Sequence, residues 1–251
     1  MTPAARAPAP VTALIAALPE ELDALLSTLE AARPESLAGR TFWRGTLAGQ
    51  PVLAVLSGIG KVAAALTTTL LVSHFGAARV LFVGVAGGIG AGVQVGDIVV
   101  ADALLQHDMD ASPLFPRHEV PLTGLSRFPA DAGFTDAVQR ASIATLQAHQ
   151  EVAAFVGRTP RVHRGLVLSG DRFVATAAEG TALRERLPDA LAVEMEGAAV
   201  AQVCHAFGVP LAVVRSISDR ADDAAHLDFP AFLRQVAGPL GREIVQRVMQ
   251  A

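Results

Sequence analysis

The chain has 251 residues, of which 51% are hydrophobic, and it carries 20 Lys and Arg against 24 Asp and Glu. This length and hydrophobic share suit one large α/β domain or two small ones with a sizeable core. The basic residues are scattered through a mildly acidic chain, and no uninterrupted apolar stretch is long enough to cross a bilayer, so the sequence argues against both a nucleic-acid partner and a membrane span.

We expect a single domain over residues 11–251, preceded by a disordered leader over residues 1–10. Prolines among the first ten residues interrupt the apolar helix that a signal peptide needs. Cys204 is the only cysteine, which excludes an intramolecular disulfide and fits a reducing compartment. The sequence therefore predicts a cytoplasmic protein.

Apolar runs alternate with amphipathic segments along most of the chain. In chain order the pattern predicts strand 11–17, helix 19–29, strand 51–56, helix 61–75, strands 79–85, 96–101, 163–168 and 190–195, helix 196–207, strand 209–217 and helix 229–249. Residues 108–130, which are rich in proline, are predicted to form a long loop. Continuously apolar strands separated by helices are typical of a parallel or mixed sheet that is covered on both faces.

Polar residues follow several of these predicted strands. They are Glu21, Ser57, Asp171, Glu196 and the group at 215–219. In open α/β sheets, ligands bind at the carboxyl ends of the strands. Because these residues come from separate strands, they predict one binding site at that edge of the sheet.

A glycine pattern after the strand at 51–56 allows another interpretation. Gly58, Gly60 and Ala63 match the dinucleotide-binding fingerprint between a strand and a helix. The next strand, however, ends without the acidic residue that would hold a ribose. Hydride transfer therefore stays a minor alternative beside a tight turn that lets a ligand or backbone approach closely.

Other residues of reactive types are given structural roles. The segment His-Asp-Met-Asp at 107–110 could bind a metal by residue type, but it lacks the usual ligand spacing, so we predict no metal and a solvated or partner-facing loop. Asp222 and Asp223 are expected to cap a helix or face solvent. Cys204 and His205 are expected to pack within their helix.

Seven segments taken together resemble the 5′-methylthioadenosine/S-adenosylhomocysteine nucleosidases, in order and at similar spacing. They are ALPEE at 17–21, SGIGKVAAA at 57–65, AGG at 86–88, VGDIV at 95–99, SGDRF at 169–173, VEME at 193–196 and RSISD at 215–219. The resemblance implies the nucleoside-phosphorylase fold, a three-layer α/β/α sandwich around a central mixed sheet, with no cofactor. It also implies hydrolysis of the N-glycosidic bond of methylthioadenosine and/or S-adenosylhomocysteine, in methionine and S-adenosylmethionine salvage.

The resemblance implies a catalytic role for three acidic residues. Asp219 matches the acid that protonates N7 of adenine, and Ser218 would orient it. Glu196 matches the carboxylate that binds the ribose hydroxyls, with Met195 packing against the sugar. Glu21 matches the residue that positions and activates the attacking water.

The remaining matched positions would shape the binding site. Arg215 matches a residue that helps to hold the site, and Phe173 and the Val174 backbone match the positions that contact adenine. Ile59 and Phe229 would line the pocket for the 5′-substituent.

The chemistry accounts for these residue types. Glycosidic cleavage passes through an oxocarbenium-like state, which a protonated leaving group and a nearby carboxylate stabilise more than the ground state. Asp219 must then hold a proton near neutral pH, and the apolar run before it could raise its pKa by desolvation. Taken alone, Glu196 and Asp219 are each explained equally well as acidic residues at a helix start.

The first loop favours water over phosphate as the nucleophile. Phosphorylases of this fold place an arginine-bearing segment there, whereas this chain has Glu20 and Glu21, which would repel phosphate. A phosphorylase remains the nearest alternative, because the fold hosts both activities. Hydrolysis of another 5′-modified adenine nucleoside, such as aminodeoxyfutalosine, and a non-catalytic nucleoside-binding protein also stay open.

The chain departs from the family's usual pattern in three places. Val85 stands where a hydroxyl residue often precedes Ala-Gly-Gly, and Leu18 replaces the usual Met of the first loop. The chain has no tyrosine, so Phe115 would supply any aromatic contact to the 5′ pocket from the loop at 105–124. In the family this loop reaches the neighbouring subunit's site, which implies a homodimer.

Overall fold

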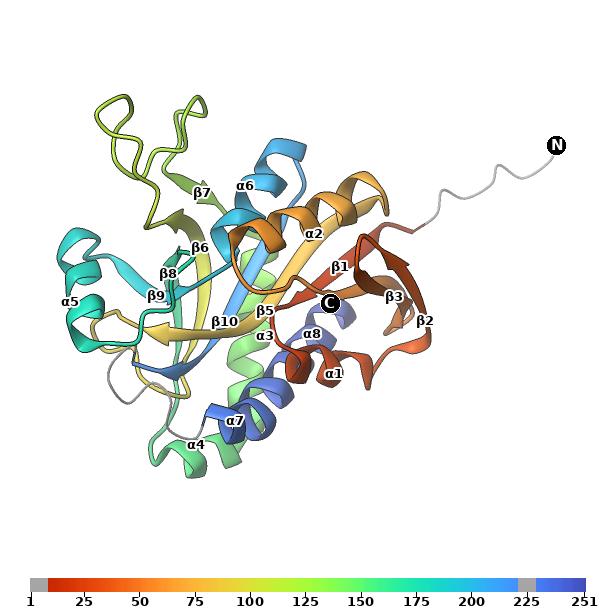
Figure 1. Ribbon diagram of the computed structural model, residues 1–251. Coiled ribbons are helices and arrows are strands. Elements are labelled where there is room, and N and C mark those ends of the chain that lie inside the picture. The colour runs from red at the N-terminus through yellow and green to blue at the C-terminus, as the bar shows by residue number, and fades with distance from the viewer. Residues whose placement is uncertain (1–8, 221–228) are drawn as a thin grey trace.

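A central sheet with helices on both faces forms the body of the protein in the computed structural model, which describes residues 9–220 and 229–251 (Figure 1). The strands are β1 (Val11–Ala16), β2 (Glu30–Leu37), β3 (Arg40–Leu47), β4 (Gln50–Leu56), β5 (Ala77–Gly88), β6 (Ile98–Gln106), β7 (Arg127–Pro129), β8 (Val162–Ser169), β9 (Ala190–Glu194) and β10 (Leu211–Asp219). The helices are α1 (Pro19–Leu26), α2 (Lys61–Ser73), α3 (Ala132–Ala148), α4 (Gln150–Val156), α5 (Ala177–Arg186), α6 (Gly197–Phe207), α7 (Phe229–Phe232), the π-helical turn η1 (Leu233–Ala237) and α8 (Gly238–Gln250). Asp222 and Asp223 lie outside the described residues.

The sheet is mixed, as the sequence predicts. Its strand order is β10-β6-β8-β9-β5-β1-β4-β3-β2, with β7 added beside β6. The long strand β5 pairs with β1 and β10 in parallel and with β9 in antiparallel. Because β10 pairs with both β5 and β6, the five strands β5, β10, β6, β8 and β9 close into a ring. This closure brings several strand ends to one place.

Two hydrophobic clusters hold the layers together. One lies between the sheet and the pair α2 and α6, and includes Phe42, Leu71 and Cys204. The other lies on the opposite face, where α1, α3 and α8 pack on the strands through residues such as Leu25 and Leu240. Figure 1 shows these two groups of helices on either side of the sheet.

The predicted strands and helices are all present, but the prediction omits six further elements. These are β2, β3, β7, α3, α4 and α5. Strand β2 is exposed along nearly its whole length and contains a proline and charged residues, so it lacks the apolar alternation that reveals a strand. The predicted closing helix is also interrupted, since η1 separates α7 from α8.

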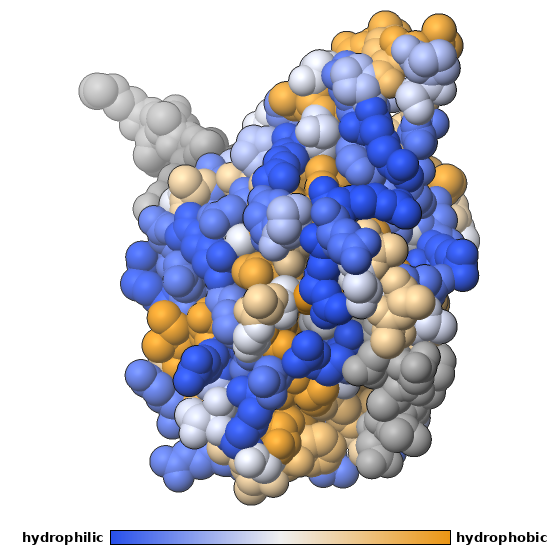
Figure 2. Space-filling model, turned by 90° about the vertical axis from the view of Figure 1, so that its left-hand side faces the viewer, coloured by the Kyte–Doolittle hydropathy of each residue, from blue (hydrophilic) through white to orange (hydrophobic). Residues whose placement is uncertain are grey.

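The predicted loop at 108–130 contains the short strand β7 and forms a projection over residues 107–126, which rises at the top of the molecule in Figure 2. Leu114 and Leu122 on this projection are 84% and 92% exposed. Among the described residues, no helix combines the length and apolar character that a membrane crossing requires.

Candidate active site

A pocket of about 220 Å³ opens at the carboxyl ends of the strands. Its lining residues come from the ends of β1, β4, β5, β8, β9 and β10 and from the start of α7. They are Ala17, Leu18, Ile59, Val85, Ala86, Gly87, Arg172, Phe173, Val174, Val193, Glu194, Met195, Glu196, Ser218, Asp219 and Phe229. Aliphatic and aromatic side chains dominate this lining, so the acidic groups stand out against an apolar wall.

Asp219 is the last residue of β10 and is 7% exposed. The Ser218 hydroxyl donates to Asp219 Oδ2 at 2.7 Å, which fixes the carboxyl group. The strand end is held from the β5–β6 turn, since Gly96 N donates to Ile217 O and Ile217 N to Asp97 O, both at 2.8 Å. Asp97 is itself fully buried.

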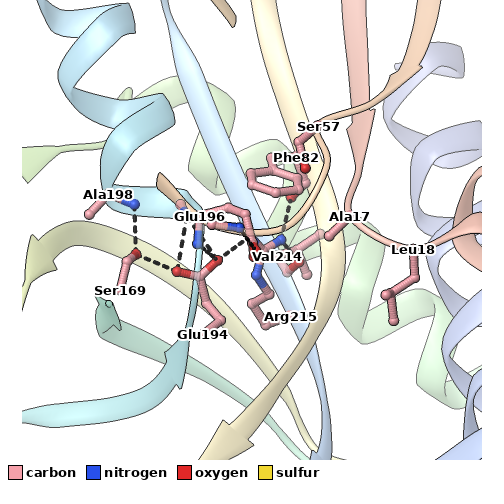
Figure 3. Close-up of polar contacts among 12 residues, drawn as sticks. Ala17, Leu18, Ser57, Phe82, Ser169, Glu194, Glu196, Ala198, Val214 and Arg215 are labelled. Atoms are coloured by element: carbon pink, nitrogen blue, oxygen red, sulfur yellow. Dashed lines mark hydrogen bonds and ion pairs between the residues drawn. The ribbon is translucent and has the colours of Figure 1, made fainter. Parts of the chain in front are cut away.

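Glu194 and Arg215 form a buried ion pair beneath the pocket, with 2.6 Å between Arg215 Nη2 and Glu194 Oε2 (Figure 3). The Ser169 hydroxyl donates to Glu194 Oε1, and the Gly197 amide at the start of α6 donates to the same carboxylate. The Arg215 guanidinium lies 3.9 Å from the centre of the Phe82 ring. Every polar atom of Glu194 thus has a partner, and its charge is compensated.

Glu196 follows Glu194 by two residues and turns toward the pocket at the start of α6. The Gly60 amide donates to Glu196 Oε1 at 2.8 Å. Burial, together with the nearby negative charge of Glu194, raises the pKa of Glu196 to about 7. Its carboxyl group therefore changes charge near neutral pH.

Glu21 is the third residue of α1 and is 4% exposed. Its Oε2 accepts hydrogen bonds from Ala17 N at 3.1 Å and Leu18 N at 3.0 Å. Its Oε1 has no hydrogen-bond partner among the described residues. Burial raises the pKa of Glu21, outweighing the backbone hydrogen bonds and the charge of Arg215.

The Glu21 carboxyl lies behind the pocket wall rather than in it. It lines a separate internal cavity of about 10 Å³, together with Gly84, Ser216 and Gly238. A cavity of this size holds about one water molecule. Ala17 and Leu18, whose amides bind Glu21, form part of the main pocket wall.

The backbone amides of the turn between β4 and α2 bind carboxylates from other loops, at the place where a dinucleotide would need them for its phosphates. Gly60 N donates to Glu196, and Lys61 N donates to Asp171 Oδ1 at 2.7 Å. Phosphate groups bind such helix N-terminal amides, and here those amides are already used. The glycine pattern therefore serves the tight turn, with Gly60 at φ +92°, and the dinucleotide interpretation is wrong.

The His-Asp-Met-Asp segment at 107–110 makes polar contacts with its neighbours. Within residues 9–220 and 229–251, no three or more His, Cys, Asp or Glu side chains come together in a way that could hold a metal ion. Asp108 pairs with Lys61 at 2.6 Å, and Asp110 bonds to Ser112 in the exposed loop.

Cys204 and His205 differ in their surroundings. Cys204 is 2% exposed, and burial raises the pKa of its thiol to about 12, so it packs as an inert core residue. His205 is exposed, with its ring edge-on to Phe128 at 5.7 Å between centroids. The expectation that His205 is packed inside its helix is thus wrong, because it lies in the last, solvent-facing turn of α6.

The structure brings most of the predicted site residues together. Eight of them line the pocket: Ile59, Phe173, Val174, Met195, Glu196, Ser218, Asp219 and Phe229. Glu21 and Arg215 lie behind its wall, and Phe115 lies on the projection, away from the residues that line this pocket. Sequence reasoning did not assign roles to Glu194, Ser169 or Gly60, although all three fall within the motifs that it used.

Comparisons with known proteins agree with this geometry. The chain matches the model of the phosphorylase superfamily over residues 11–248. It is 35% identical over 227 residues to a 5′-methylthioadenosine/S-adenosylhomocysteine nucleosidase of Bacillus thuringiensis (strain Al Hakam), which covers 90% of this chain and 92% of that protein. Its structure is similar to that of the 5′-methylthioadenosine/S-adenosylhomocysteine nucleosidase from Neisseria meningitidis in complex with methylthio-immucillin-A, with a TM-score of 0.84, 33% identity and coverage of 96% and 98% of the two chains. It is also similar to a futalosine hydrolase of Helicobacter pylori strain 26695, with a TM-score of 0.82, 31% identity and coverage of 96% and 98%.

Proposed function

The chain belongs to the 5′-methylthioadenosine/S-adenosylhomocysteine nucleosidases of the phosphorylase superfamily, and from this premise we propose that it hydrolyses the N-glycosidic bond of one or both of these nucleosides. The products are adenine and the 5-thio-substituted ribose. One observation carries the proposal: Asp219 and Glu196 line the same apolar pocket, and the Ser218 hydroxyl donates to Asp219 there.

Asp219 acts as the general acid in this proposal. It protonates adenine at N7 while the C1′–N9 bond breaks and its electron pair moves into the base. Protonation of the leaving group lowers the barrier, and a positioned acid typically contributes about 10²–10⁴-fold. The hydrogen bond from Ser218 aims the carboxyl group.

Glu196 binds the ribose hydroxyls and stabilises the positive charge that develops on the sugar. The Gly60 amide donates to Oε1 of this carboxyl group and holds it at the pocket wall. A carboxylate held in a buried, apolar setting favours the cationic transition state more than the neutral substrate. Met195 packs beside the sugar, and Phe173, which is 48% exposed, stacks on the base with the Val174 backbone at its edge.

Glu21 takes a proton from the water that attacks C1′. Its Oε1 has no hydrogen-bond partner among the described residues, and burial raises the pKa of the carboxyl group above its usual value, which makes it a stronger base. Its position behind Ala17 and Leu18 means that the substrate complex must bring water to this oxygen, and catalytic hydrogen bonds of this kind commonly tighten only when substrate is bound. Arg215 supports both Glu21 and Glu196 electrostatically.

The 5′ end of the pocket decides which nucleoside is preferred. Ile59 and Phe229 line it in this chain, and no tyrosine is available to add to it. Aminodeoxyfutalosine is the second candidate substrate, because a futalosine hydrolase is among the similar structures. Both candidates share the adenine and ribose contacts proposed above.

We also propose that the protein is a cytoplasmic homodimer whose 105–124 loop lies near the partner's site. The projection carries the exposed Leu114 and Leu122, and Phe115 is placed there rather than in its own chain's pocket. Ile59, which lines the pocket, and Val62 on α2 are 63% and 80% exposed. These apolar surfaces support a protein partner, since large exposed hydrophobic groups gather at interfaces. We further propose that residues 11–251 form one domain.

Adenine release tests the reaction. Methylthioadenosine, S-adenosylhomocysteine, 5′-deoxyadenosine, adenosine and aminodeoxyfutalosine are each supplied with and without phosphate. We expect phosphate-independent release from one or more of the 5′-modified nucleosides, with sharp loss in Glu21→Gln and Asp219→Asn. Asp189→Asn, which alters a surface pair with Arg127, is the control and should match the wild type.

The same assay separates the alternatives. Release that requires phosphate identifies a phosphorylase and contradicts the hydrolase. Tight nucleoside binding by a wild-type protein that never turns over identifies a binding protein. If both Asp219→Asn and Glu21→Gln keep wild-type rates, the proposed roles of these residues are wrong.

A further inference from the structure

Lys61, Asp108 and Asp171 form a closed ring of contacts outside the pocket wall. Lys61 N donates to Asp171 Oδ1 at 2.7 Å, Asp171 N donates to Asp108 Oδ2 at 2.9 Å, and Lys61 Nζ lies 2.6 Å from Asp108 Oδ1. The three residues follow β4, β6 and β8, so each contact joins a different pair of loops. This ring is called the clasp below.

The clasp lies next to both halves of the proposed nucleoside site. Ile59 and Gly60 directly precede Lys61, and Gly60 N holds the ribose-binding Glu196. On the other side, Phe173 and Val174 follow Asp171 by two and three residues and form the base-binding wall. The clasp therefore connects the turn that holds Glu196 to the loop that carries the base-binding residues through direct polar contacts.

We propose that Lys61 and Asp108 are positioning residues that fix the ribose-binding turn relative to the base-binding loop, so that the two halves of the nucleoside are bound together. This inference rests on the proposed function. Neither side chain lines the pocket, so each acts through the backbone that it holds.

Within the clasp the Lys61–Asp108 ion pair is more buried than a surface pair, although the side chain of Asp171 is 51% exposed. The side chains of Lys61 and Asp108 are 15% and 32% exposed, whereas those of the surface pair Arg127 and Asp189 are 45% and 53% exposed. Exposed pairs contribute little because water and salt screen them. Burial by itself would raise the pKa of Asp108. The hydrogen bonds from Lys61 and from the Asp171 amide outweigh this effect and hold the pKa below its usual range.

The loops that the clasp joins also pack tightly. A Cβ added to Gly170 would overlap the His107 ring, and one added to Gly60 would lie 3.1 Å from Asp171 Oδ1. His107 N donates to Ser169 O at 3.0 Å, which ties the ends of β6 and β8 together. This close fit lets a small displacement of Asp108 move the base-binding loop.

Kinetics of three variants test the inference. Lys61→Met keeps the apolar stem but removes the charge. Asp108→Asn keeps the shape but turns an amide NH₂ toward one of two donors. The third variant combines them, and Asp189→Asn is the matched control because it alters an ion pair of the same 2.6 Å length at the surface. The kcat and KM for methylthioadenosine are measured, together with the Kd for adenine by calorimetry.

We expect each single variant to raise KM about tenfold, which corresponds to about 1.4 kcal/mol, while kcat stays within about threefold. The adenine Kd should weaken as well, although neither altered side chain lines the pocket. The KM and Kd of the double variant should resemble those of the single variants, because either substitution alone already breaks the Lys61–Asp108 ion pair.

Other results overturn the inference. KM and adenine Kd within about twofold of the wild type in both single variants would show that the clasp does not position the site. A double variant whose effect is the product of the two single effects would show two independent contacts. If the wild type binds adenine but releases none from any nucleoside, the proposed function is wrong. The adenine Kd values of the variants still decide whether the clasp positions the site.

Discussion

Replacing Glu196 with glutamine should stabilise the folded protein at alkaline pH. Burial and the neighbouring Glu194 raise the pKa of Glu196 from 4.5 to about 7 in the folded state. Each unit of pKa difference corresponds to about 1.4 kcal/mol, so ionising Glu196 in the folded protein costs about 3 kcal/mol. Glutamine is close in shape, can still accept from Gly60 N, and carries no charge to desolvate.

The sign of the effect follows from proton binding. Because the folded state binds the proton of Glu196 more tightly than the unfolded state, the unfolding free energy of the wild type falls as pH rises from 4.5 to about 7. Glu196→Gln lacks this fall. The variant should equal the wild type near pH 4 and exceed it by up to about 3 kcal/mol at pH 8.5, which is a rise in Tm of about 6–12 °C for a chain of this size.

Calorimetric Tm values across pH 4 to 9, at one fixed protein concentration, provide the measurement. The control is Glu30→Gln on the exposed strand β2, where charge removal should leave the difference near zero at every pH. The reasoning is refuted if the gap between Glu196→Gln and the wild type does not widen between pH 5 and pH 8. Nucleoside binding by the same variant should weaken, which separates the stability gain from function.

Further substitutions probe the supports of the site. Arg215→Met should lower the unfolding free energy, measured by urea unfolding, by about 3–5 kcal/mol, because it leaves the Glu194 charge buried without its partner. Adding Glu194→Gln to this variant should recover most of the lost unfolding free energy. Gly60→Ala should cost about 1–2 kcal/mol and raise KM, because its φ of +92° and the nearby Asp171 leave no unstrained place for a Cβ. Asp97→Asn should cost about 1.5–3 kcal/mol by urea unfolding and lower kcat, because the buried carboxylate holds the turn that fixes the end of β10. Unchanged values for any of these would contradict the role given to that residue.

The sequence was sufficient to predict that acidic residues meet at the carboxyl ends of the strands. This worked because β1, β4, β8, β9 and β10 each contain an apolar run and are parallel to a neighbour, so that polar residues at or directly after their ends share one edge. Glu196 and Asp219 could be located in this way without knowledge of any contact.

Contacts between distant loops could not be predicted in the same way. Glu194 pairs with Arg215, which is 21 residues away, and Asp171 with Lys61, which is 110 residues away. Local periodicity carries no information on such pairs. The sequence also hides which oxygen faces the ligand: Glu21 follows its strand as expected, yet its carboxyl turns back to its own helix start and lies behind the pocket wall.

A helix-capping contact and the proposed active-site role are compatible, because carboxyl groups at this site accept hydrogen bonds at helix starts. Glu21 accepts from amides at the start of α1, Glu194 from the start of α6, and Glu196 from the start of α2. The N-terminal amides of α2 and α6 therefore bind carboxylates that line the pocket, and those before α1 bind Glu21 behind its wall, so carboxylates fill places where phosphate would bind. Among the described residues Arg215 is the buried basic side chain beside these acids, so the site holds more carboxyl groups than cations. Such a site repels a phosphate dianion and attracts the cationic sugar of a hydrolytic transition state, at the cost in stability that Glu196→Gln should recover.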